Sequence, residues 1–103
     1  MTAEKKKKRG TYQPCPLATR RVKLPPDLEA LVERLAEHVH DVWACQRMTN
    51  GWTYGPQRND TSKQHPNLVP YRELSEADKD LDRKAVRGTL HAIVAMGYRI
   101  TKP

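Results

Sequence analysis

A helical apolar pattern with a clear start and a clear stop constrains this fold more than any other feature. Pro25 and Pro26 precede Asp27, and both proline and acidic residues favour the first turn of a helix. Asn50-Gly51 is a typical helix stop. Between these signals the side chains on the expected core face recur at steps of three and four: Leu28, Leu31, Val32, Leu35, Val39, Val42 and Gln46. The spacing predicts a single amphipathic helix of about six turns.

A second helix is predicted to begin after Ser75, because a hydroxyl at the N-cap is followed three residues later by Asp78. It should run to Met96, with Gly97 as its terminator. Gly88 in its interior costs about 1 kcal/mol relative to Ala, which predicts a close approach of the first helix at that point. The expected core stripe of this helix comprises Leu81, Ala85, Thr89, Ala92, Ile93 and Met96.

The segment between the helices, residues 51–73, carries turn residues throughout but also apolar and aromatic ones, so an ordered, packed loop is expected. Short strand pairing is predicted around Leu68-Val69 and Tyr98–Ile100, which are rich in β formers. The fold class is therefore mainly α with minor β: an antiparallel two-helix unit with a long packed loop and short strands. Because two helices bury little surface, a homodimer is expected to complete the core.

Charge divides the chain into a tail and a domain. The formal net charge is +7, and the first 23 residues, with eight Lys or Arg and one Glu, account for all of it. Residues 1–10 are predicted to be a disordered basic tail, and residues 11–103 a single domain entered through an extended arm, residues 11–24. The tail either contacts nucleic acid or an acidic partner or serves only as a solvated tail; its charged residues are Lys5, Lys6, Lys7, Lys8 and Arg9.

Several classes of protein lack support in the sequence. No apolar run is long enough for a membrane span, and no secretory signal follows the basic cluster, so a cytoplasmic location with reduced Cys15 and Cys45 is expected. His38 and His40 lie about 200° apart around a helix and cannot share a metal, and no other metal-ligand spacing occurs. Without a nucleophile motif, a phosphate loop or a dinucleotide fingerprint, the chain is predicted to be no enzyme and to use no cofactor.

One set of side chains has the spacing of a binding site. His40, Trp43 and Arg47 stand at i, i+3 and i+7, which places them on one helical face. The indole can stack on a base while the guanidinium or the imidazole bonds a phosphate. The alternative is that Trp43 is a core residue with the other two at its edge.

The loop supplies further candidates. Trp52 and Tyr54 follow the helix stop and are either ligand contacts or loop anchors. Arg58, Lys63 and His65 either add cationic contacts to the site or are ordinary polar surface residues.

Several multi-residue motifs occur in the order found in a known family, and the chain resembles the ryanodine-receptor repeat domain over roughly residues 12–101. The motifs are Tyr12-x-Pro14-x-Pro16, Leu24–Leu28, Leu35–Glu37, His40–Ala44, Gly51–Gly55, His65–Tyr71 and Thr89-Leu90 with Met96–Tyr98.

The resemblance implies a mostly helical module with an accessory short sheet. The family occurs in tandem copies in animal calcium-release channels and singly in bacterial and phage proteins. In the receptors two repeats pack about a pseudo-twofold axis, and an adenine nucleotide can lie between them, stacked by a tryptophan from each first helix. This implies a stacking role for Trp43, with His40 and Arg47 beside it. Channel activity is not implied, because 103 residues hold no pore.

The predicted function is a non-enzymatic, homodimeric module that binds an adenine-type or cyclic nucleotide, or a signal derived from one, as a sensor or a sequestering protein. The alternative is a module that contacts protein or nucleic acid through the basic tail and has no small-molecule ligand. A purely structural subunit of a larger assembly is a third reading.

Overall fold

The structure is a computed structural model that describes residues 10–103. The prediction of a disordered basic tail, and the partner contacts predicted for Lys5 to Arg9, lie outside these residues. Only Gly10, an exposed turn residue, belongs to both ranges.

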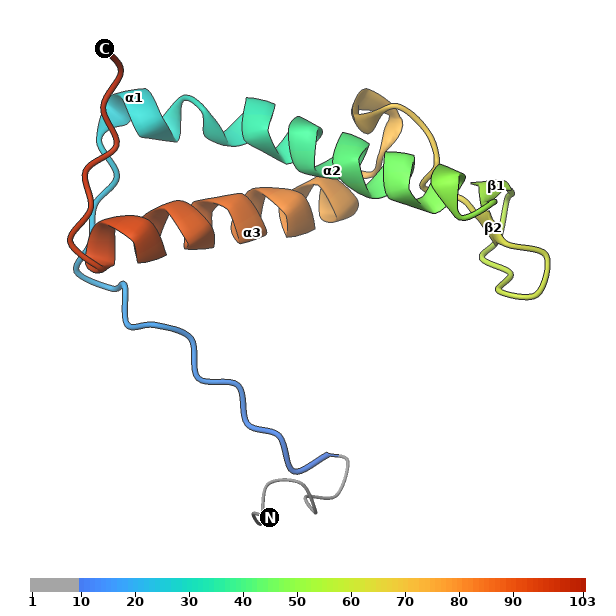
Figure 1. The fold of residues 1–103 in the computed structure, drawn as a ribbon, viewed down its shortest axis with the longest axis horizontal. Coiled ribbons are helices and arrows are strands. Elements are labelled where there is room, and N and C mark those ends of the chain that lie inside the picture. Colours follow the sequence, from blue (N-terminus) through green and yellow to red (C-terminus); the bar gives the residue numbers. More distant parts are fainter. Residues whose placement is uncertain (1–9) are drawn as a thin grey trace.

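The described chain is mainly helical with one small sheet, so the predicted class of mainly α with minor β is confirmed. Its elements are α1 (Pro26–Glu29), α2 (Val32–Thr49), β1 (Thr53–Tyr54), β2 (Gln64–His65), the 3-10 helix η2 (Tyr71–Glu73) and α3 (Glu76–Ala95). Figure 1 shows α2 and α3 side by side and antiparallel, with the loop that carries β1 and β2 at one end of the pair.

The prediction of one continuous first helix is wrong, because the chain forms two helical segments. The Leu31 amide donates to the Leu28 carbonyl three residues back, at 3.0 Å, whereas the Leu35 amide donates to the Leu31 carbonyl four residues back, at 2.9 Å. The change in hydrogen-bond spacing separates α1 from α2 at Ala30 and Leu31. The predicted stop is confirmed: α2 ends at Thr49 with Asn50 as C-cap.

The predicted stripe is confirmed at Leu28 and Val32, which are buried, and at Leu35, which packs against the core, but beyond Leu35 the core lies on a different face of α2. The buried residues of α2 are Val32, Ala36 and His40, whereas Val39 and Val42 are 38% and 51% exposed. The core cluster comprises Val32, Ala36, Tyr71, Leu74, Val86 and Leu90. Tyr71 and Leu74 come from the end of the loop, so the loop decides which side of α2 is covered.

Helix α3 begins as predicted, with Ser75 as its N-cap, and ends at Ala95, one residue before the predicted end. Its buried residues are Val86 and Leu90, so its predicted stripe is also wrong; Leu81, for example, is 68% exposed. The predicted close approach at Gly88 is wrong as well, since no heavy atom lies within 4 Å of the position that a Cβ would take there.

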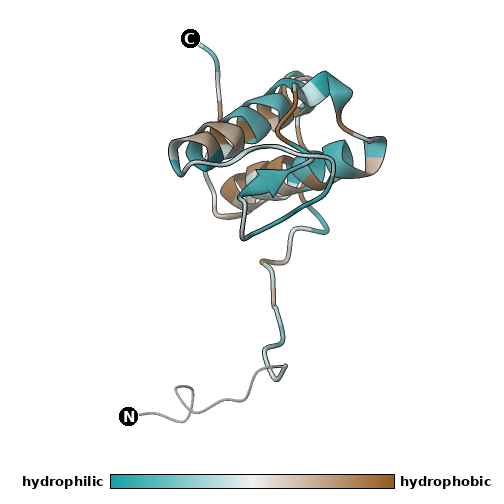
Figure 2. Cartoon of the chain, turned by 90° about the vertical axis from the view of Figure 1, so that its right-hand side faces the viewer, coloured by the Kyte–Doolittle hydropathy of each residue, from teal (hydrophilic) through white to brown (hydrophobic). Residues whose placement is uncertain are grey.

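The strands form within the loop rather than at its end. β1 and β2 pair in parallel, with Thr53 opposite Gln64, and no strand occurs at Leu68-Val69 or at 98–100. The Asn59 side chain accepts hydrogen bonds from the amides of Thr61 and Ser62, at 3.0 Å each, and so closes the turn that returns the chain to β1. Figure 2 shows this loop in hydrophilic colours at the end of the helix pair.

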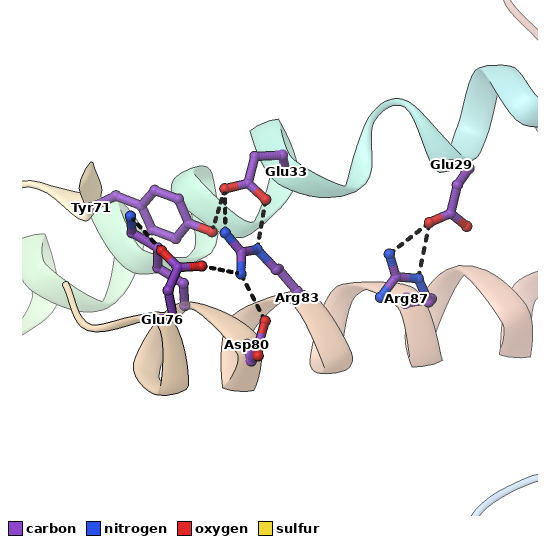
Figure 3. A network of polar contacts seen from close by, with 8 residues as sticks. Glu29, Glu33, Tyr71, Glu76, Asp80, Arg83 and Arg87 are labelled. Carbon is purple, nitrogen blue, oxygen red and sulfur yellow. Dashed lines mark hydrogen bonds and ion pairs between the residues drawn. The ribbon is translucent and has the colours of Figure 1, made fainter. Parts of the chain in front are cut away.

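Ion pairs join the two long helices and α1 (Figure 3). The spacing of Glu29 and Glu33 predicts only a solvated face, but Arg83 donates two hydrogen bonds to Glu33, at 2.6 and 3.0 Å, and Arg87 bonds Glu29 at 2.6 Å. Tyr71 also donates to Glu33, at 3.0 Å. The Arg83 guanidinium is the main reason that the pKa of Glu33 lies below its ordinary value.

The arm, residues 11–24, lacks helix and strand, but it is not extended throughout, because a turn at Arg20 and Arg21 is closed by a hydrogen bond from the Val22 amide to the Thr19 carbonyl. Val22 and Leu24 are half-buried, and Leu24 packs against the core, whereas Tyr12 and Leu17 are 77% and 56% exposed. Figure 1 shows the arm leaving the helices and projecting away from them.

Candidate functional site

The structure brings His40, Trp43 and Arg47 together on one face of α2. The ring centroids of His40 and Trp43 lie 5.6 Å apart, and the guanidinium carbon of Arg47 lies 5.5 Å from the Trp43 centroid. His40 is buried, while Trp43 and Arg47 are half-buried. The imidazole is therefore at the core end of the row and the guanidinium at the loop end.

His40 has a structural partner. Its Nε2 donates to the Val69 carbonyl at 2.7 Å, and its ring lies 6.2 Å from the ring of Tyr71. This bond ties the loop to α2 and uses the Nε2 donor. A phosphate contact from the row predicted in the sequence therefore falls to Arg47.

The helix stop at Gly51 folds Trp52 back onto Arg47. Gly51 has a φ of +90°, which glycine adopts without strain, and the Trp52 amide then donates to the Arg47 carbonyl at 3.0 Å. As a result the guanidinium carbon of Arg47 lies 4.5 Å from the centroid of the Trp52 ring. Arg47 thus makes cation–π contacts with both tryptophans.

His65 on β2 completes the cluster. Its ring meets Trp43 edge-on at a centroid distance of 4.9 Å and lies 6.3 Å from Trp52. Its Nδ1 accepts a hydrogen bond from the Asn67 amide at 3.0 Å, so the neutral ring carries its proton on Nε2. Burial, and then the positive charges of Arg47 and Arg58, lower the pKa of His65. The sequence suggested that His65 is either a cationic contact or an ordinary surface residue. In the structure its neutral ring instead forms part of the cleft wall.

A cleft of about 190 Å³ opens beside this cluster, between α2 and α3. From α3 it receives Asp78 and Asp82, one helical turn apart, which sequence reasoning missed. Their i, i+4 spacing was the available signal, but nothing local shows which face of α3 turns toward Trp43. The cleft is lined by His40, Trp43, His65, Asn67, Leu74, Asp78, Leu81 and Asp82.

Four predicted site residues lie outside the cleft lining: Arg47, Trp52, Tyr54 and Arg58. The guanidinium carbon of Arg58 lies 6.0 Å from the centroid of the Trp52 ring, and its Nε donates to Asp60 at 2.8 Å. That carboxylate raises the pKa of Arg58. Tyr54 on β1 is 57% exposed and joins none of the ring contacts recorded within residues 10–103.

Residues 10–103 contain no group of three His, Cys, Asp or Glu side chains that could hold a metal ion. Cys15 and Cys45 are free and exposed. No helix in this range is both long and apolar enough to cross a membrane.

A comparison with protein families agrees with the resemblance seen in the sequence motifs. The model of the RyR domain family matches residues 12–102, nearly the whole described chain. The chain therefore belongs to the RyR domain family.

Proposed function

We propose that this member of the RyR domain family is a non-enzymatic module that binds a nucleotide or a nucleotide-derived signal, with the base stacked on Trp43. The observation that carries the proposal is the cleft walled by the half-buried Trp43, with two guanidinium groups gathered next to it around Trp52. Stacking of a base on an aromatic ring contributes about 1–3 kcal/mol.

Arg47 supplies the donors for a phosphate. Its guanidinium faces two indole rings and makes no ion pair among residues 10–103, so its N–H groups remain available. Arg58, which is oriented by its ion pair with Asp60, places a second guanidinium near the Trp52 ring. Guanidinium groups bind phosphate oxygens through paired, charge-assisted hydrogen bonds.

A second copy of the chain is proposed to cover the ligand. The cleft of about 190 Å³ is smaller than the roughly 300–1,000 Å³ of most small-molecule pockets, so it holds one ring system and leaves the rest of a nucleotide outside. The family resemblance implies a ligand between two repeats, and a second copy of this repeat would supply the other half of such a site.

The exposed apolar side chains between α2 and α3 favour one face for this homodimer. Val39 and Val42 on α2 and Leu81 on α3 are all exposed, and Leu81 also lines the cleft. An apolar groove of about 230 Å³ continues along the helices from there; it is lined by Leu35, Val39, Ala85, Val86, Thr89 and Leu90. Burying this face in a second copy would stabilise both protomers.

Thermal shift against mono-, di- and cyclic nucleotides tests the binding proposal. A ligand at 100 times its Kd adds about 2.7 kcal/mol, which raises the melting temperature of a domain this size by several degrees. Trp43→Leu keeps apolar volume but removes the large ring, and it should abolish the shift. The matched control is His38→Ala, an exposed change on the same helix. A shift that persists in Trp43→Leu, or no shift with any nucleotide, would contradict the proposal.

Light scattering after size exclusion tests the homodimer. Val42→Glu should convert it to a monomer, whereas Met48→Glu should not, although both side chains are more than half exposed on α2. A wild-type protein that is monomeric with and without bound nucleotide would contradict the paired site.

The distribution of charge favours a second candidate function. The whole net charge of +7 is accounted for by the first 23 residues, a pattern that suits contact with nucleic acid or an acidic protein. Binding of this kind should weaken steeply with salt and disappear on deletion of residues 1–10. It should be unaffected by Trp43→Leu, which separates the two functions.

A further inference from the structure

We propose that the cleft takes the nucleoside end of the ligand and excludes its phosphates, with Asp82 accepting a hydrogen bond from an N–H or O–H of the nucleoside. This inference rests on the proposed function. It adds which end of the ligand enters and which chemical group the cleft selects.

Of the two carboxylates in the lining, only Asp82 has no hydrogen-bond or ion-pair partner within the described residues. Asp78, one turn before it, accepts a hydrogen bond from the Ser75 hydroxyl at 2.9 Å. Asp82 makes no hydrogen bond and no ion pair within residues 10–103. On the α3 side, the cleft is therefore lined by one carboxylate that already accepts a hydrogen bond and one that does not.

The unsatisfied carboxylate is also partly removed from water. Asp82 is half-buried, and this burial raises its pKa. A partly buried carboxylate without a partner is stabilised by a hydrogen-bond donor on a ligand, because hydrogen bonds to charged groups are stronger than those between neutral groups. The group that fits the wall is consequently a donor and not another acceptor.

Charge gives the bound ligand a direction. Two carboxylates line the cleft on α3, while Arg47 and Arg58 lie around Trp52, outside the cleft lining. A phosphate would be repelled by the first pair and attracted by the second. The Nε2–H group of His40 is not free to attract a phosphate into the cleft, because it already bonds the Val69 carbonyl. With its base on Trp43, a nucleotide therefore places its sugar or base edge at Asp82 and its phosphates toward the arginines.

Two parts of a nucleoside offer the required donor. One is the exocyclic amine of an adenine-type base, and the other is a ribose hydroxyl, a group that acidic side chains bind in dinucleotide sites. Inosine lacks the amine and 2′-deoxyadenosine lacks the 2′-hydroxyl, so their affinities relative to adenosine identify the source.

Calorimetric titration of the full chain with adenosine tests the acceptor. Asp82→Ala should weaken adenosine binding by about tenfold or more, the loss expected for a hydrogen bond to a charged group. Asp41→Asn removes the same charge from an exposed site on α2 and should leave the affinity unchanged. Adenosine affinity within twofold of the wild type in Asp82→Ala would overturn the inference.

Titration with AMP tests the direction. Its 5′-phosphate should strengthen binding over adenosine in the wild type, and Arg47→Ala should remove that gain. Asp82→Asn, which keeps an acceptor but removes the charge, should leave the gain unchanged. A gain that grows in Asp82→Asn would mean that the phosphate enters the cleft, which overturns the inference.

The outcomes separate this inference from the proposed function. If the wild type binds adenosine and Trp43→Leu does not, while Asp82→Ala binds like the wild type, only the inference fails. If the wild type binds another nucleotide but neither adenosine nor AMP, only the inference fails; if it binds no nucleotide of the thermal-shift panel, both fail.

Discussion

Arg47 and Trp52 stack on each other, with the guanidinium carbon 4.5 Å from the centroid of the indole ring. The contact joins the last turn of α2 to the loop, because the Trp52 amide also bonds the Arg47 carbonyl at 3.0 Å. The same guanidinium lies 5.5 Å from the Trp43 ring, so one side chain links the indole of the cleft to the loop beside it. The helix stop and the candidate site are therefore one piece of structure.

Replacing Arg47 should loosen this end of the domain. Arg47→Ala removes both cation–π contacts, and the free energy of unfolding should fall by about 1 kcal/mol. The tryptophan emission should also shift to longer wavelength as Trp52 gains contact with water. Urea unfolding followed by fluorescence measures both effects. Arg34→Ala, an exposed change on the same helix, is the control, and equal losses in the two variants would refute a specific role for Arg47.

Two glycines should respond in opposite ways to the same substitution. A Cβ on Gly55 would lie 2.6 Å from the Cβ of Gln64, so Gly55→Ala forces β1 and β2 apart and should lower stability by about 1–3 kcal/mol. A Cβ on Gly88 meets nothing within 4 Å in the interior of α3, so Gly88→Ala should raise stability by about 0.5–1 kcal/mol. Chemical denaturation of both variants measures the signs, and a stabilised Gly55→Ala would show that the β1–β2 pairing is not formed.

Acid should weaken the ion pairs between the helices. The pKa of Glu33 is lowered in the folded protein, chiefly by hydrogen bonds from Arg83. Its contribution to stability is therefore present above the unfolded pKa of about 4.5 and is lost as the pH falls through the folded pKa. Glu33→Gln should lower the melting temperature at pH 7 and reduce its further fall toward pH 3. Glu37→Gln, at an exposed position one turn on, should keep the wild-type profile.

As the pH falls, the stability contributed by the candidate site should be lost at a higher pH than the stability contributed by the ion pairs between the helices. Burial and the nearby arginines lower the pKa of His65, so the stability that its neutral ring contributes is present above about 6.5 and is lost as the pH falls through the folded pKa. Protonation at Nδ1 also removes the acceptor for the Asn67 amide. NMR titration should show His65 protonating below the ordinary histidine pKa of 6.5. Protonation at or above that value would mean that the ring is not packed against Trp43.

Local signals in the sequence located the helix ends well. Asn50-Gly51 and the Ser75 cap mark boundaries that the structure has within one residue, because capping depends on atoms within one turn of the chain. The row of His40, Trp43 and Arg47 could likewise be placed on one face from spacing alone. The break at Ala30 and Leu31 had no comparable signal.

The covered faces could not be predicted in the same way. Both helices carry apolar residues around much of their circumference, and the pattern favoured Val39 and Val42 over Ala36 and His40. The structure covers the latter pair, because Tyr71 and Leu74 pack there after the loop has turned back. The strand pairing of Thr53 with Gln64 depends on the Asn59 turn in the same way.

By itself, then, the sequence determined that this chain is helical, where the first long helix stops and the second begins, and which side chains of α2 share a row. Those properties follow from backbone hydrogen bonding and rotation over a few residues. Only the tertiary structure decided that Asp78 and Asp82 line the same cleft as Trp43, that His65 is a neutral wall of that cleft, and that Val39, Val42 and Leu81 are left exposed. These properties depend on the path of the loop before α3 begins. That path is determined by contacts between segments that are distant in the sequence.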